Sequence, residues 1–179
     1  GKADGSDCTM ELRGDSFEYR DTTDGKPLII KATRHELDES YKKWWRFLKG
    51  AWTYEISPSN EKGTVTWRIA AKGNAMVGRF ENENGSVALE ISGRQADLQR
   101  EMVNGYASDG GCWTIEITDY SDDEFEGNNY GVLPDGKPFS GRFVGKKVDD
   151  DHYQWTFTGK DGDGNPLTMT GNYARKKQD

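Results

Sequence analysis

Apolar and polar residues alternate strictly through most of the chain after Gly50, and this alternation limits the folds that the sequence can adopt. Trp52, Tyr54 and Ile56 are separated by polar residues, and a sheet with one buried and one solvated face produces this period of two. The same period returns in segments 65–69, 87–91, 113–117, 153–157 and 167–173, and weaker strands fit at 75–82, 97–104, 126–133 and 138–147. The pattern predicts about eight to ten strands.

Turn-forming residues separate these strands at short, regular intervals. They are Gly73-Asn74, Asn84-Gly85, Asp109-Gly110-Gly111, Asp135-Gly136 and Asp161-Gly162-Asp163-Gly164. Because no interval is long enough for a crossover helix, we expect antiparallel pairing in sequence order. The favoured fold is therefore an all-β, antiparallel up-and-down β-barrel, which removes its edge strands by closing, and a β-sandwich is the alternative.

The segment before Gly50 follows a different period. Leu37, Tyr41, Trp44, Trp45 and Leu48 fall on one face of a helix that begins near His35 and ends before Gly50. Residues 1–34 are polar, and Asp24-Gly25 predicts a β-hairpin turn between segments 17–20 and 28–31. We therefore expect an N-terminal extension over residues 1–34, and a helix followed by the barrel over residues 35–179.

Composition excludes several classes of protein. The chain has 179 residues and a net charge of -7, and its 6 Trp, 8 Tyr and 7 Phe argue against disorder despite only 33% hydrophobic residues. Its dispersed Lys and Arg do not predict nucleic-acid binding, and no apolar stretch is long enough for a transmembrane segment.

Cys8 and Cys112 predict either one long-range disulfide or two free thiols. The start without Met indicates a removed targeting segment or an artificial start, so we expect a secreted or periplasmic protein.

The junction between helix and first strand carries a family resemblance. Its sequence, Phe47-Leu48-Lys49-Gly50-Ala51-Trp52, resembles the opening of lipocalin and other calycin barrels, in which a short helix leads into Gly-x-Trp. Segment 135–142 is similar to the tail of bacterial lipocalin-like domains, and the resemblance covers about residues 47–175. It implies a lipocalin-like β-barrel in which Gly50 and Trp52 open the first strand. It also implies that Arg175, at the end of the last strand, stacks over Trp52 and closes the barrel's end.

Motifs for catalysis or metal binding are incomplete. His35-Glu36 begins like a zinc motif but has Glu39 where the second His is needed, and His152 fits a solvated turn better than a haem ligand. The acidic residues of segment 161–165 copy half of a calcium loop, and a hairpin turn explains them better. We therefore predict no catalytic residues, no metal and no cofactor.

The predicted inner face is instead rich in aromatic side chains. Taken in the phase that buries Trp52, it contains no Asp, Glu, Lys, Arg or His, which argues against acid–base catalysis inside the barrel. It predicts a small apolar or aromatic ligand, bound in the barrel or at its mouth. The alternatives are a barrel enzyme such as an isomerase or cyclase with polar mouth residues, and a filled barrel that acts as an interaction module. The candidate ligand-binding residues are Tyr54, Trp67, Ile69, Phe80, Leu89, Trp113, Ile115, Tyr153, Trp155 and Met169.

Overall fold

The chain divides into two units, Gly1–Leu37 and Asp38–Asp179, and the computed structural model describes residues 9–13, 16–23, 26–33, 39–95 and 100–177. The first unit is an antiparallel sheet of β1 (Thr9–Arg13), β2 (Ser16–Thr23) and β3 (Lys26–Thr33). β2 and β3 are the two strands expected for the hairpin, and their turn at residues 24–25 lies outside the described residues. β1 is an additional strand that pairs with β2.

The second unit is a closed barrel of ten antiparallel strands. Each strand pairs with the next in sequence, and the last pairs with the first, so the predicted up-and-down barrel is confirmed over the sandwich. A short helix, α1 (Glu39–Leu48), precedes the barrel, and a 3₁₀ turn (Ala71–Gly73) joins its second and third strands. The strands are β4 (Gly50–Ser57), β5 (Glu61–Ala70), β6 (Ala75–Asn82), β7 (Val87–Gln95), β8 (Arg100–Ala107), β9 (Cys112–Tyr120), β10 (Glu124–Val132), β11 (Pro138–Lys147), β12 (His152–Asp161) and β13 (Pro166–Arg175).

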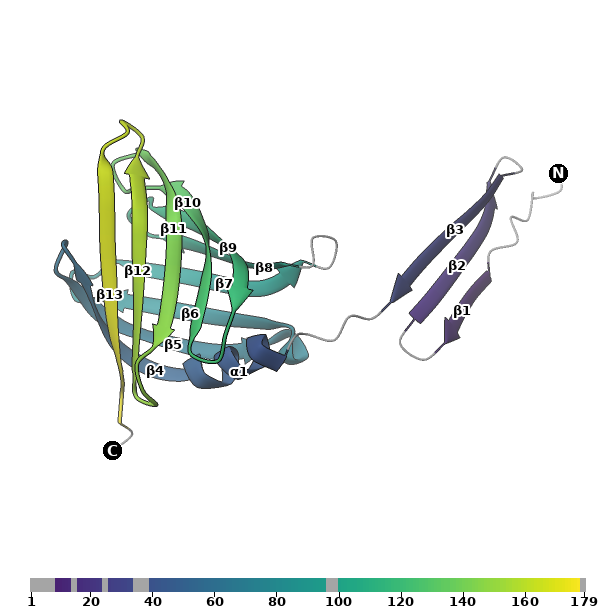
Figure 1. Cartoon of the computed structure of the whole chain (residues 1–179), viewed down its shortest axis with the longest axis horizontal. Helices are drawn as coiled ribbons and strands as arrows, with labels where there is room; N and C mark the ends of the chain where they lie inside the picture. Colours follow the sequence, from purple (N-terminus) through teal and green to yellow (C-terminus); the bar gives the residue numbers. More distant parts are fainter. Residues whose placement is uncertain (1–8, 14–15, 24–25, 34–38, 96–99, 178–179) are drawn as a thin grey trace. The chain divides into compact units, whose positions relative to one another are not determined.

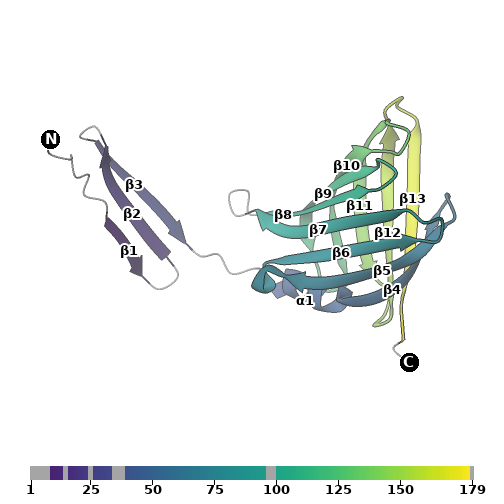
Figure 2. The ribbon, with the colours of Figure 1, turned by 180° about the vertical axis from the view of Figure 1, so that it is seen from behind.

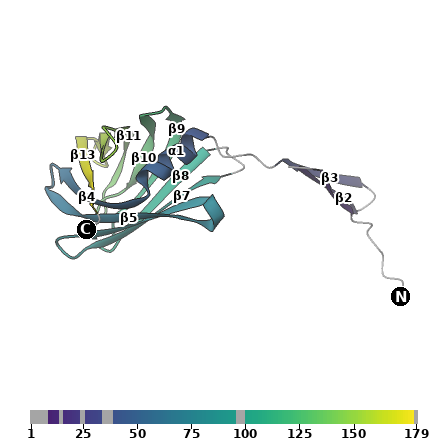
Figure 3. The same cartoon turned by 90° about the horizontal axis from the view of Figure 1, so that it is seen from below.

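The two ends of the barrel differ. α1 lies at the end where β13 finishes, which we call the helix end, and Figure 3 shows this end from below. Its apolar face is buried as the helical period predicts, and the Trp44 indole donates a hydrogen bond of 3.0 Å to the Ser121 carbonyl in the β9–β10 turn. Lys43 adds an exposed ion pair with Asp122 at 2.7 Å. At the opposite end, which we call the turn end, hairpins such as Asn84-Gly85 connect the strands. Among the described residues, no helix has the length and apolar character needed to cross a bilayer.

The predicted orientation of β7 is wrong. Leu89 lies opposite Arg79 on the outer wall, so Leu89 and Ile91 point away from the interior and are 47% and 55% exposed. Ala88, Glu90 and Ser92 face inward instead, in register with the inward residues of β6 and β8. Alternation alone distinguishes the two faces of a strand but not which one is inside. Figure 2 shows β7 between β6 and β8 in the wall of the barrel.

Ile69 has the predicted inward phase, because it pairs with the buried Met76. It lies at the helix-end terminus of β5, however, and is 38% exposed, so it is not part of the core. The interior of the barrel is therefore built from a partly different set of residues than the one predicted.

Candidate functional site

The barrel encloses a cavity of about 430 Å³, so its interior is not filled by side chains. Residues of all ten strands and of α1 line it, and the lining reaches the β4–β5, β8–β9 and β10–β11 turns through Ser59, Asp109 and Leu133. Eight of the ten candidate ligand-binding residues are part of this lining, whereas Ile69 and Leu89 are not. These eight are Tyr54, Trp67, Phe80, Trp113, Ile115, Tyr153, Trp155 and Met169.

Glycines opposite the large rings explain how an aromatic interior keeps open space. Trp67 pairs with Gly78, and Trp113 pairs with Gly105 on the neighbouring strand. A Cβ atom at Gly78 would lie 2.5 Å from the Trp67 Nε1, and one at Gly105 would overlap the Trp113 ring. Each indole therefore lies across the place that a side chain would occupy, and the ring is held against the wall of the barrel.

Glu90 lies between these two indoles, at the centre of one cross-strand row. The register runs Trp67, Gly78, Glu90, Gly105 and Trp113 across β5 to β9, and we call these residues the Glu90 row. The Trp113 Nε1 donates a hydrogen bond of 3.1 Å to the Glu90 Oε2. The Trp67 Nε1 also interacts with this carboxylate but is buried without a well-formed hydrogen bond. The indoles that lie over the two glycines therefore flank the Glu90 side chain on both sides.

The prediction that the inner face carries no Asp, Glu, Lys, Arg or His is consequently wrong, because Glu90 faces inward. Burial among aromatic rings raises the pKa of Glu90 to about 7, and the two indole N–H groups limit that rise by stabilising the charged form. At neutral pH the carboxyl is thus divided between its protonated and ionised forms. The signal that could have located it is the glycine at the paired position on each neighbouring strand. A Cβ at Gly78 or Gly105 would meet an inward-facing indole, so these glycines mark the inner face on which Glu90 lies.

A second carboxyl, Glu101 on β8, lies toward the helix end of the cavity and is 7% exposed. Its Oε1 accepts hydrogen bonds from the Ser92 hydroxyl and, at 3.2 Å, from the Trp45 indole of α1. Burial, with a smaller contribution from the charge of Glu90, raises the pKa of Glu101 to about 8. Glu101 also interacts with the neighbouring Tyr41 hydroxyl, but neither that hydroxyl nor the Glu101 Oε2 has a well-formed hydrogen bond among the described residues. Glu101 is therefore mainly protonated at neutral pH.

Further polar atoms of the lining are buried and unpaired within the described part of the chain. They are the Oδ1 atoms of Asn82 and Asn129. Buried polar groups normally have partners, so these acceptors are available to a bound molecule. No group of three or more His, Cys, Asp or Glu side chains among the described residues is arranged to hold a metal ion.

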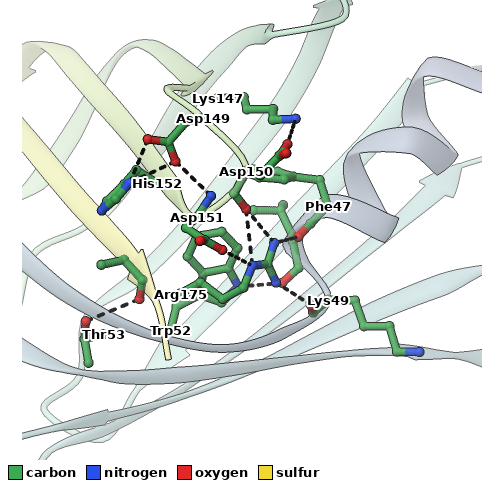
Figure 4. A network of polar contacts seen from close by, with 12 residues as sticks. Phe47, Lys49, Trp52, Thr53, Lys147, Asp149, Asp150, Asp151, His152 and Arg175 are labelled. Atoms are coloured by element: carbon green, nitrogen blue, oxygen red, sulfur yellow. Dashed lines mark hydrogen bonds and ion pairs between the residues drawn. The ribbon is translucent and has the colours of Figure 1, made fainter. Parts of the chain in front are cut away.

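Arg175 lies at the helix end, outside the cavity lining (Figure 4). Its guanidinium is 4.2 Å from the centroid of the Trp52 ring, and its Nη2 donates a hydrogen bond of 2.8 Å to the Phe47 carbonyl. The Trp52 indole donates in turn to the Leu48 carbonyl at 2.8 Å, so strand β13, strand β4 and the end of α1 are joined at one point. Gly50 has a φ of +123°, and a Cβ there would lie 3.4 Å from Arg175 Nη1.

The other candidates from the sequence are His152, segment 161–165 and the cysteines. His152 is exposed at the start of β12, where its Nδ1 lies 2.8 Å from an oxygen of Asp149 (Figure 4). The Asp161 carboxylate accepts hydrogen bonds from the backbone of Asp163 and Asn165, which is a turn rather than a calcium loop. Cys112 is half-buried with a free thiol, and Cys8 lies outside the described residues.

Comparison with known proteins adds solved structures of low similarity. No protein-family model matches the chain, and no curated protein matches it. A de novo designed fluorescence-activating β-barrel is 15% identical over 75% of this chain and 98% of that chain, with a TM-score of 0.39. A redesigned β-barrel bound to DFHBI is 13% identical over 73% and 97%, with a TM-score of 0.34. A protein of unknown function from the DUF3598 family of Nostoc punctiforme is 10% identical over 94% and 65%, with a TM-score of 0.39. The function therefore has to be inferred from the cavity itself.

Proposed function

We propose that the barrel binds a small organic molecule, aromatic or otherwise largely apolar, inside its cavity. The observation that carries this proposal is the cavity of about 430 Å³. It stays open among large rings because the indoles lie close against the glycines of the neighbouring strands. Small-molecule sites are typically concave, about 300–1,000 Å³ in volume, and mostly apolar with a few well-placed polar groups. Phe80, Trp113 and Tyr54 supply apolar surface here, and Glu90 and Asn129 supply the polar groups.

The same proposal includes the finer description of the barrel as lipocalin-like. It is supported by the order of α1, Gly50, Trp52 and the ten-strand meander, and by the position of Arg175 over the Trp52 ring. In such a barrel the helix end is closed and the ligand enters from the opposite end. Here the turns at the opposite end contribute Ser59, Asp109 and Leu133 to the cavity lining, which supports entry at the turn end.

A cavity-filling variant tests the proposal. Ala88 is buried and lines the cavity, whereas the adjacent Leu89 faces outward, so the two positions are one residue apart on opposite faces of β7. We expect Ala88→Trp to abolish the fluorescence rise of N-phenyl-1-naphthylamine, a neutral aromatic probe, and Ala88→Leu to weaken it. Leu89→Trp should bind as the wild type does. Equal binding by Ala88→Trp, or no binding by the wild type, would contradict the proposal.

A second candidate function, acid–base catalysis on an apolar substrate, is favoured by one observation. Glu90 has its pKa raised to about 7 inside an aromatic cavity, which is the property of a general base that works near neutral pH. A carboxylate there could take a proton from a carbon next to a carbonyl group and return it. Deuterium incorporation from D₂O into 2-tetralone, faster with wild type than with Glu90→Gln, would support this candidate, and equal rates would exclude it for ketones of this kind.

A further inference from the structure

We propose that the cavity selects a cationic ligand, an aromatic or alkyl amine whose ammonium group pairs with the Glu90 carboxylate between the Trp67 and Trp113 indoles. This inference rests on the proposed function, because it assigns the chemical class of the molecule that the cavity holds. Three features of the cavity support it, which are the charges of the lining, its unpaired acceptors and the geometry of the Glu90 row.

The charged residues of the cavity have one sign. Its lining contains four acidic residues, Glu61, Glu90, Glu101 and Asp109, and no Lys, Arg or His among the residues that the structure describes. The described titratable groups that affect Glu90 or are affected by it are Glu101 on β8, Tyr153 on β12 and Tyr173 on β13, none of which becomes cationic. Arg94 pairs in register with Glu101 at the helix end of β7, but it is not part of the lining.

A buried carboxylate without a counter-ion is unfavourable, and a ligand that supplies the positive charge removes this disadvantage. An anionic ligand would bring a further negative charge to a lining that has no cationic side chain among the described residues. A neutral ligand would leave Glu90 either protonated or without a partner charge. The lining therefore favours a cation over both alternatives.

Two unpaired acceptors belong to the lining of the same cavity. They are the Oδ1 atoms of Asn82 and Asn129, which are buried without a partner among the described residues. An ammonium group offers up to three donors and no acceptor, so it can supply the hydrogen bonds that these oxygens lack. A carboxylate or phosphate, which only accepts, cannot supply them.

The indoles of the Glu90 row supply the second element of ammonium recognition. Trp67 and Trp113 reach toward Glu90 from both sides, each across a glycine, and the Trp67 ring lies 5.8 Å from that of Phe80, perpendicular to it. The N–H edges of both indoles are directed at the carboxylate and stabilise its ionised form. Glu90 is thereby suited to act as the counter-ion of an organic cation in an aromatic cavity. The cavity volume of about 430 Å³ leaves space for an amine that carries one or two rings.

Affinity for an amine should depend on pH in a way that a neutral ligand does not share. The pKa of Glu90 is about 7 in the protein alone. Below that pH, an ammonium ion that pairs with the carboxylate must therefore displace a proton from it. Affinity for the amine should then increase as the pH rises through 7, as long as the amine itself stays protonated. The tightest binding is expected between the pKa of Glu90 and that of the amine.

The test is a matched series of three probes that share one ring system and differ in charge. They are 2-(2-naphthyl)ethylamine, 2-(2-naphthyl)ethanol and 2-naphthylacetate, and binding to the full chain is measured by titration calorimetry. At about pH 8 we expect the amine to bind at least about tenfold more tightly than the alcohol, and the acetate to bind most weakly. Wild-type protein at about pH 6 should release close to one proton per amine bound, seen as a dependence of the enthalpy on the buffer.

Glu90→Gln keeps the size of the side chain and removes the charge, and Glu81→Gln on the outer face of β6 is the matched control. Glu90→Gln should lose about tenfold or more in affinity for the amine, keep its affinity for the alcohol, and show no proton release. Glu81→Gln should behave as the wild type does, because Glu81 is exposed and pairs with Arg79.

The outcomes separate this inference from the proposed function. If neither the three probes nor N-phenyl-1-naphthylamine binds, the proposed function fails and the inference fails with it. If the alcohol binds as tightly as the amine, the cavity remains a binding site but the preference for cations is refuted. If the amine is preferred and Glu90→Gln keeps that preference, the assignment to Glu90 is wrong.

Discussion

The buried carboxyl of Glu101 makes the stability of the barrel dependent on pH, and Glu101→Gln should remove the part of that dependence that Glu101 contributes. In the folded protein the pKa of Glu101 is raised to about 8 from its ordinary value of 4.5, mainly because the group is buried. A group whose pKa is higher in the folded state binds its proton more tightly there, so it stabilises the fold at low pH. This stabilisation is lost as the pH rises from about 4.5 to about 8.

The size of the effect follows from these two pKa values. Between about pH 5 and pH 8 the unfolded chain has already released the proton, while the folded chain keeps it until the pH approaches 8. Integration at about 1.4 kcal/mol per pH unit gives a loss of about 3 kcal/mol in the free energy of unfolding over this range. Since small domains are stable by about 5–15 kcal/mol, such a loss is large enough to measure.

Urea denaturation of the full chain at about pH 5, 6, 7 and 8 measures the effect. Glu101→Gln retains an oxygen that accepts from Ser92 and Trp45, and it cannot ionise, so its free energy of unfolding should fall by about 3 kcal/mol less than that of the wild type. Glu81→Gln, which removes an exposed carboxylate, should keep the wild-type slope. Parallel pH profiles for wild type and Glu101→Gln would refute the argument, because they would show that Glu101 ionises equally in both states.

Three further predictions concern the rings and the closed end. Gly105→Ala should destabilise the barrel by about 1–3 kcal/mol and change the Trp emission spectrum, whereas Gly93→Ala, with its nearest neighbour at 3.6 Å, should change neither. Arg175→Ala should lower the free energy of unfolding by about 2–4 kcal/mol in urea, because it removes the ring contact and unpairs several carbonyls; a loss below about 0.5 kcal/mol would contradict this. Phe80→Ala should weaken N-phenyl-1-naphthylamine binding, and Leu89→Ser should leave it unchanged; the reverse order, by fluorescence titration, would mean that the probe binds outside the cavity.

The architecture of the barrel is predictable from local sequence signals. Period-two alternation and Gly-containing turns determine where strands begin and end, and the predicted strands 75–82 and 138–147 coincide with β6 and β11. The short connections also force antiparallel neighbours, so strand order follows chain order. None of these signals requires knowledge of distant contacts.

The site is less predictable because it depends on which face of each strand is inside. Leu89 and Ile91 are apolar and were expected in the core, yet cross-strand register places Glu90 there. The burial of an acidic residue contradicts the average preference of single residues, and only the pairing with Gly78 and Gly105 accounts for it. Packing between strands, rather than the hydrophobicity of one strand, decides the phase.

The glycines opposite the indoles have a consequence for how such a protein can change its ligand. Gly78, Gly105 and Gly171 each make room for one Trp on the adjacent strand. The interior therefore contains cross-strand pairs in which one residue is a Trp and the other is a glycine. Exchanging both members of a pair together would reshape one wall while the total side-chain volume stayed constant, and the other pairs would keep the barrel closed. Cavity shape could then vary in single coupled steps without loss of the fold. New specificities would accordingly be expected to arise through paired substitutions on adjacent strands.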